Sequence, residues 1–512
     1  MNTESNLDPN SEGMDRFAGV LLHPSSLPGS GPIGTLGKEA FRFVDFLARS
    51  GFGIWQVLPL GPTGETHSPY ATFSSTAGNT QLLDGEQLVQ DGLIAPHLVK
   101  SGNSASRVDF AGATIQSRKY IAAAADALVV DHPLYPDFLA FLGDQAGWLN
   151  DFALFMALKE KHAGAHWSEW ETPYRTRDAQ ALKIWVQENQ EVVKIQKIGQ
   201  YLFYRQWLAL KAYANARQIR IVGDVPFYVA FDSADVWTHP EYFALDLTTH
   251  RPRLMAGVPP DYFSTTGQLW GNPCYDWENI ARDNYSWWVE RFRRLNEVVD
   301  IVRVDHFRGF DEYWAVGEGE TTAINGTWLK SPGNSFFKVL ERELGHLPIW
   351  AEDLGLMSDG VGKLRDDFNF PGMKILQFAF DDQGASNPYL PHNYIHNCVV
   401  YSGTHDNDTT CHWASELSKE QIAQINDYLG KPALELPGDF LRMGISSVAR
   451  FAVFPLQDLL GLGGEGRMNV PGHEEGNWGY RANEDDFDQD LERELGQLLA
   501  TYGRRVTFKD GR

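Results

Sequence analysis

Ionisable residues crowd into an otherwise apolar stretch of this chain. Residues 298–314 read VVDIVRVDHFRGFDEYW and begin as a buried strand would, yet Arg303, Asp305, His306 and Arg308 fill the second half. Burying such groups is costly unless they are paired. Either a structural ion-pair cluster or a carboxylate held by an arginine for chemistry would account for them.

Carboxylates also end two later apolar runs. Glu352 and Asp353 end the run LPIWAEDLG, and Asp406 and Asp408 follow NCVVYSGT. One such residue is usually a helix cap or a salt-bridge partner, but three runs ending this way, counting Asp305, favour a shared site. Carboxylates that face one another across a pocket suit a retaining reaction at a glycosidic bond. One attacks the anomeric carbon, and another about 5 Å away gives and then takes a proton.

The surroundings of these carboxylates suggest different roles. Arg303 lies two residues before Asp305, so in a strand both side chains point to one face, and the guanidinium favours an ionised nucleophile. Glu352 lies between apolar segments, which would raise its pKa towards that of a usable acid. The neighbours of the third carboxylate, His405 and Asn407, could bind sugar hydroxyls.

Eight short apolar runs would position these groups. They are 19–23, 53–60, 219–229, 298–307, 347–355, 373–380, 397–406 and 450–460. Near-continuous apolar runs are typical of parallel strands that are buried on both faces. Helical patterns lie between several of them, as at 39–52, where Gly51 ends the pattern. The order predicts an α/β fold, a (β/α)₈ TIM barrel with helical and loop insertions between strands, whose functional groups lie at the carboxyl ends of the strands.

Two insertions interrupt this pattern. About 160 residues separate the second and third runs, far more than one loop and helix need. We interpret 85–215 as an α-rich insertion subdomain and 232–290 as an active-site loop insertion. The second contains AGVPPDYFSTTGQLWGNPCYDW (256–277), whose Pro, Gly, Tyr and Trp content predicts an ordered loop at the barrel mouth. We expect 1–512 to form a single catalytic barrel that carries both.

Composition limits the possible partners. The net charge of −23 argues against nucleic acid and anionic membranes. Aromatic residues make up 13% of the chain and include 16 Trp, which would suit either sugar rings or a Trp-rich core. Three widely spaced cysteines indicate no disulfide framework, no signal-peptide pattern opens the sequence, and no stretch approaches a membrane span. We therefore expect a cytoplasmic protein.

Several motifs together carry a resemblance to a known family. They are HPSSLPG (23–29), SPYATFSSTAGN (68–79), GDVPFYVAFDSADVW (223–237), GVPPDYFSTTGQLWGNP (257–273), VRVDHFRGF (302–310), AINGTW (323–328), WAEDLG (350–355), YSGTHDND (401–408) and MNVPGHEEGNWGYR (468–481). In this order they resemble the 4-α-glucanotransferases called amylomaltases or disproportionating enzymes, glycoside hydrolase family 77. The resemblance spans nearly the whole chain.

The resemblance implies a role for individual residues. Asp305 would be the nucleophile, Glu352 the general acid/base and Asp406 the transition-state stabiliser. Residues implied to bind the glucan are Tyr70, Asp261, Trp270, Arg303, His405 and Asn407. The implied reaction transfers α-1,4-glucan segments between malto-oligosaccharides by double displacement. Since carboxylates suffice for it, we expect no metal and no organic cofactor.

Some alternatives stay open at this stage. Hydrolysis would use the same carboxylates as transfer, and the outcome depends on whether water or a sugar reaches the intermediate. A non-catalytic glucan-binding barrel would keep the aromatic residues and lose the carboxylates. His306 and Arg308 could bind substrate or brace their loop, and Asp224 could be a turn residue or a ligand. The sequence does not settle the oligomeric state.

Overall fold

A closed barrel of eight parallel strands forms the centre of the protein. The computed structural model describes residues 16–99, 106–246, 248–260, 264–355, 358–381, 383–432, 436–473 and 475–507. The barrel strands are β1 (Phe17–Leu21), β2 (Ile54–Gln56), β3 (Arg220–Val225), β6 (Ile301–Val304), β9 (Ile349–Ala351), β10 (Gly372–Ile375), β11 (Cys398–Tyr401) and β12 (Phe451–Pro455). Each pairs with its neighbour in chain order, and β12 pairs with β1 to close the ring. The predicted TIM barrel is confirmed.

Each of the eight predicted runs overlaps a barrel strand, although most of the strands are shorter than their runs. The run 298–307, for example, contributes only β6, and Asp305 lies just past its end. The polar residues that close several of the runs, such as His23, Asp305 and Asp406, therefore occupy the loops at the carboxyl edge of the barrel. This is the edge at which the loops of such barrels build functional sites.

Helix α1 (Lys38–Ser50) shows why the local sequence forms these elements. Its apolar residues recur at helical spacing, so Phe43, Val44, Phe46 and Leu47 are buried against the barrel. Gly51 ends the helix in the left-handed conformation at φ 86°, which favours glycine. The helix predicted within 39–52 is confirmed.

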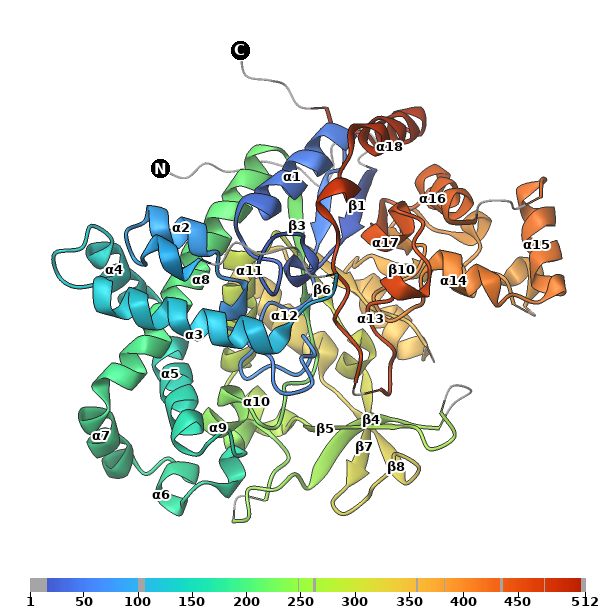
Figure 1. Cartoon of the computed structure of the whole chain (residues 1–512). Helices are drawn as coiled ribbons and strands as arrows, with labels where there is room; N and C mark the ends of the chain where they lie inside the picture. The colour runs from blue at the N-terminus through green and yellow to red at the C-terminus, as the bar shows by residue number, and fades with distance from the viewer. Residues whose placement is uncertain are drawn as a thin grey trace.

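Helices fill the chain between β2 and β3. They are α2 (Gly85–Gln90), α3 (Phe110–Ala127), α4 (Tyr135–Asp144), α5 (Ala146–Lys161), α6 (Thr172–Arg175), α7 (Ala179–Glu188) and α8 (Gln190–Ala216). Most of them extend to one side of the barrel, at the left of Figure 1. The long helix α8 packs against both α5 and α3 before it leads into β3. Whether 85–215 is a separate subdomain stays a prediction.

A second, antiparallel sheet lies in the lower part of Figure 1, below the barrel. Its order is β5 (Gln268–Pro273), β4 (Leu254–Val258), β7 (Glu312–Gly317) and β8 (Gly326–Lys330). The sequence predicted an ordered loop for 256–277, whereas the structure forms a β-hairpin there. The hairpin pairs with strands more than fifty residues later, and local sequence patterns do not reveal such long-range pairing. The prediction of 232–290 as an active-site insertion is otherwise untested.

The remaining α-helices follow β3 in the chain. They are α9 (Ala234–Thr238), α10 (Trp277–Arg282), α11 (Ser286–Val298), α12 (Gly333–Leu344), α13 (Asp359–Asp367), α14 (Thr410–Ser415), α15 (Lys419–Leu429), α16 (Leu436–Ser446), α17 (Leu456–Leu459) and α18 (Gln489–Thr501). Among the residues that the structure describes, no helix has the length and apolar character needed to cross a membrane.

Candidate active site

Asp305 lies at the carboxyl end of β6 and is held by a buried arginine. Nη1 of Arg303 donates to Oδ1 of Asp305 at 2.9 Å and to both carboxylate oxygens of Asp224 at 2.8 and 2.6 Å. Burial alone would lower the pKa of Arg303, but the carboxylates of Asp224 and Asp305 outweigh it and raise that pKa. The guanidinium therefore stays charged beside Asp305, whose side chain is 29% exposed.

Asp224 is the buried partner that orients this arginine. It lies in β3 next to Arg303 in β6, and its side chain is fully buried. The hydroxyl of Tyr70 also donates to Asp224 at 2.9 Å, and the ring of Tyr70 stacks on His405 with centroids 5.1 Å apart. Asp224 is thus neither a turn residue nor an exposed ligand. It joins Arg303 to Tyr70 across the barrel mouth.

Glu352 follows β9 and faces the same part of the barrel mouth. Its two carboxylate oxygens accept hydrogen bonds from the backbone amides of His306 at 2.7 Å and Leu354 at 3.0 Å. Burial, together with the negative charge of Asp305, raises the pKa of Glu352 to about 8. The sequence-based expectation of a raised pKa is confirmed in direction. A carboxyl group with this pKa carries a proton at neutral pH and can donate it.

Asp406 lies in the loop that follows β11. Its Oδ1 accepts a hydrogen bond from Nδ2 of Asn469 at 2.7 Å and lies 3.3 Å from Nε2 of His405. Asn407 uses its side-chain oxygen locally, because Oδ1 accepts from both the amide and the hydroxyl of Thr404. The side chain of Asp406 is 46% exposed and is therefore accessible to a bound molecule.

The buried carboxylate of Asp458 anchors the loop that follows β11. Asp458, in α17, accepts hydrogen bonds from the hydroxyl of Ser402 at 2.5 Å and from the amide and hydroxyl of Thr410, each at 2.7 Å. These contacts anchor both ends of the segment 402–410. The backbone that carries His405, Asp406 and Asn407 is therefore anchored by Asp458 without any contribution from the side chains of these three residues.

Trp270, in β5, brings an aromatic surface to the same region. Its side chain is 38% exposed, and its ring lies perpendicular to the ring of His306 at a centroid distance of 5.1 Å. His306 has a left-handed backbone at φ 50°, and this geometry presents its amide to Glu352. Arg308 bonds Glu312 at 2.6 Å and covers the ring of Trp328, so it braces the second sheet.

The structure thus gathers most of the predicted site residues at one edge of the barrel. These are Tyr70, Trp270, Arg303, Asp305, Glu352, His405, Asp406 and Asn407. Asp261 lies outside the described residues. Sequence reasoning did not identify Asp224 as the partner of Arg303 or Asn469 as the partner of Asp406. Asp224 lies within the third apolar run and Asn469 lies within MNVPGHEEGNWGYR, so a signal existed for both. The pairings themselves depend on strand register and on contact between loops.

A parallel barrel with an arginine-held carboxylate beside a proton-carrying glutamate defines a class of enzyme that acts on glycosidic bonds. Comparison with known proteins narrows this class. The sequence profile of a family described as 4-alpha-glucanotransferase, glycoside hydrolase family 77, matches residues 22–486. The chain belongs to this family.

Individual relatives agree over nearly the full length. The chain is 48% identical over 503 residues to a 4-alpha-glucanotransferase of Synechocystis sp., covering 97% of this chain and 99% of the relative. It is 46% identical to a 4-alpha-glucanotransferase of Thermus thermophilus over 480 residues, 91% and 95% of the two chains. The solved amylomaltase of Streptococcus agalactiae in complex with acarbose is 38% identical, with a TM-score of 0.93 over 96% of this chain and all of that one. The protein is a 4-α-glucanotransferase, which moves α-1,4-glucan segments to an acceptor with retention at the anomeric carbon.

Proposed function

We propose that Asp305, Glu352 and Asp406 carry the transfer reaction in the roles of nucleophile, general acid/base and transition-state stabiliser. The observation that carries this proposal is the difference between the surroundings of Asp305 and those of Glu352. Arg303 lies 2.9 Å from Asp305, whereas burial keeps Glu352 protonated at neutral pH. Two carboxyl groups with such different surroundings can divide the tasks of attack and proton donation.

The first half-reaction breaks the donor bond. A carboxylate oxygen of Asp305 attacks the anomeric carbon while Glu352 gives its proton to the departing glycosidic oxygen. The released sugar leaves with a free 4-hydroxyl group, and the retained segment becomes an ester of Asp305. Positive charge that develops on the ring in the transition state lies near the exposed carboxylate of Asp406, which stabilises it.

The second half-reaction reverses these roles. The 4-hydroxyl group of an acceptor attacks the same carbon, its proton passes to the ionised Glu352, and the Asp305 ester bond breaks. Asp305 returns as a carboxylate and Glu352 as an acid. Inversion occurs twice, so the new bond has the α configuration of the old one.

Malto-oligosaccharides and longer α-1,4-glucans are the proposed substrates. Trp270 would cover a sugar ring next to the reacting bond, and His405 and Asn407 would bind hydroxyl groups near Asp406. Tyr70 would border the donor sugar and Arg303 would keep Asp305 charged. Asp261 is proposed as a further contact on the resemblance alone.

We also propose a cytoplasmic location without a nucleic-acid partner. Cys274, Cys398 and Cys411 are all unpaired, as is usual in a reducing compartment. The net charge of −23 disfavours binding to phosphate backbones.

Incubation with maltotriose tests the proposed function. Transfer yields glucose together with maltopentaose and longer chains, whereas hydrolysis yields only shorter sugars. Asp305→Asn should lower the rate by several orders of magnitude while leaving the thermal unfolding curve intact. Turnover of this variant at the wild-type rate would contradict the role of Asp305, and products no longer than maltotriose would contradict transfer. A non-catalytic glucan-binding barrel predicts no products from either protein.

A further inference from the structure

The short segment 467–469 contacts the loop after β11 at two carboxylates. Asn469 donates to Oδ1 of Asp406 at 2.7 Å, and Nη1 of Arg467 donates to Asp408 at 2.8 Å. Both carboxylates lie about sixty residues earlier in the chain, so the contacts join two loops from different parts of the barrel. Arg467 also donates from Nε to the backbone oxygen of Asn469 at 3.0 Å. Arg467 therefore contacts both Asp408 and the backbone of Asn469, the residue that bonds Asp406.

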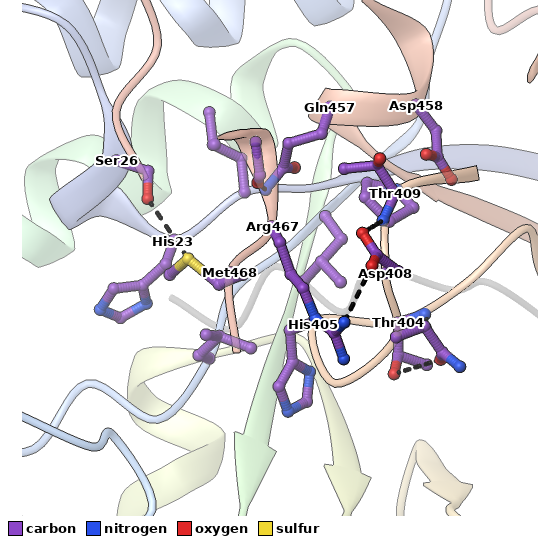
Figure 2. Close-up of a pocket in the computed structure, with 16 residues that line it drawn as sticks. His23, Ser26, Thr404, His405, Asp408, Thr409, Gln457, Asp458, Arg467 and Met468 are labelled. Carbon is purple, nitrogen blue, oxygen red and sulfur yellow. Dashed lines mark hydrogen bonds and ion pairs between the residues drawn. The ribbon is translucent and has the colours of Figure 1, made fainter. Parts of the chain in front are cut away.

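Figure 2 shows the contact between Arg467 and Asp408, both of which line a small cavity beside the loop. The side chain of Asp408 is only 11% exposed, and Nδ1 of His412 bonds the same carboxylate oxygen at 2.7 Å. Because the ion pair with Arg467 is largely shielded from water, it is stronger than an exposed pair would be. The segment 467–469 is thus fixed against the loop after β11.

The hydrogen bond from Asn469 acts on the side chain of Asp406 rather than on the loop as a whole. The backbone of 402–410 is already anchored from below by Asp458, through Ser402 and Thr410. Asp406 itself is nearly half exposed, and its carboxylate contacts the side chains of Asn469 and His405. The contact between the Asn469 amide and the Asp406 carboxylate is 2.7 Å long, shorter than the 3.3 Å contact with His405. Removing this amide would leave the loop in place and free the carboxylate to rotate.

We propose that Asn469 is a positioning residue for Asp406 and that Arg467 positions Asn469. This inference rests on the proposed function, in which Asp406 stabilises charge on the sugar ring. An N–H donor fixed on Oδ1 sets the plane of the carboxylate and leaves Oδ2 to face the substrate. Such preorganisation matters in the transition state, because a carboxylate that must reorient when charge develops stabilises it less.

Asn469→Leu tests the proposal, since it keeps the approximate shape of the side chain and removes the donor. We expect kcat with maltotriose to fall about 10- to 100-fold and KM to change much less. A loss confined to kcat marks an interaction made in the transition state. Arg467→Met should lower kcat in the same direction by a smaller factor. Arg467→Lys keeps a positive charge beside Asp408, so its kcat should lie between those of Arg467→Met and the wild type.

The matched control is Asn397→Leu, at the opposite end of β11. There Nδ2 of Asn397 donates to the backbone and side chain of Asn369 at 3.0 Å each. The control should keep the wild-type kcat. A folded Asn469→Leu variant with the wild-type kcat would overturn the proposal. If that variant does not fold, Arg467→Met decides, and a wild-type kcat there overturns it equally.

Asp406→Asn separates this inference from the proposed function. If Asp406→Asn is inactive while Asn469→Leu keeps full turnover, the positioning role fails and the function stands. If Asp406→Asn itself turns over at the wild-type rate, the proposed role of Asp406 fails, and the role of Asn469 fails with it.

Discussion

At the scale of single residues, the site is a set of charges whose surroundings differ. Arg303 links Asp305 to a fully buried carboxylate, Asp224, so the arginine cannot turn away from the barrel mouth. Glu352, by contrast, accepts hydrogen bonds from two backbone amides, and burial outweighs them and raises its pKa to about 8. The division of labour between the two carboxyl groups therefore follows from what lies next to each.

The raised pKa of Glu352 predicts how activity depends on pH. Since the first step needs the protonated form, kcat should fall as pH rises past about 8. Glu352→Gln should lower turnover of maltotriose by about 10²- to 10⁴-fold, and its residual rate should lack this decline. Initial rates between pH 5 and 9 provide the measurement. A wild-type profile that is flat through pH 9 would contradict the assignment.

The same pKa predicts an effect on stability, with a definite sign. The folded pKa of about 8 lies above the ordinary value of 4.5, so the unfolded chain loses this proton first. Glu352 therefore costs no stability below about pH 4.5, and its unfavourable contribution grows up to about pH 8. The Tm of Glu352→Gln, relative to wild type, should rise between pH 5 and pH 8. A difference in Tm that is independent of pH would show that Glu352 titrates normally.

At the scale of secondary-structure elements, the barrel was predictable and the second sheet was not. Parallel strands buried on both faces give apolar runs such as 219–229, which stand out in a local reading. The pairing of β4 with β7 joins residues near 256 to residues near 315, and no local pattern encodes it. The role of Asp224 could not be predicted for a similar reason, because its contact with Arg303 depends on the register of β3 against β6.

The second sheet supplies Trp270, and this placement leads to a prediction. Trp270 is 38% exposed beside His306, so part of its ring is available to a sugar. Trp270→Ala should raise KM for maltotriose by about 10-fold, equal to ~1.4 kcal/mol. Trp270→Phe, the matched variant, should retain most of the affinity. Unchanged KM in Trp270→Ala, or a large fall in Tm, would show that the ring serves packing instead.

At the scale of the whole molecule, the two edges of the barrel have separate tasks. The carboxyl edge carries the carboxylates, whereas buried Arg504 closes the opposite edge. Its guanidinium donates to five backbone carbonyls, those of Phe17, Ile445, Ser447, Ala449 and Arg450. These carbonyls flank β1 and β12, the strands whose pairing completes the ring. Stability and catalysis should therefore respond to different substitutions.

Arg504→Met tests this separation. It leaves several buried carbonyls without a donor and should cost ~3 kcal/mol or more of stability, seen as a lower Tm. Below the unfolding transition, kcat and KM should match the wild type. Arg505→Met is the control, because Arg505 is adjacent in sequence but exposed. The Tm of this variant should differ little from that of the wild type. A fall in kcat of folded Arg504→Met would show that the two edges are coupled.

The central claim is that Asp305 forms a covalent bond to the donor sugar, and trapping that ester tests it most directly. Glu352→Gln should accept a maltosyl group from α-maltosyl fluoride, whose leaving group needs little acid assistance. The variant should then stall, because no base activates the acceptor. Mass spectrometry of the digested protein should find one maltosyl group on the peptide that contains Asp305. A maltosyl group on any other residue, or fluoride release with no adduct at all, would contradict the account.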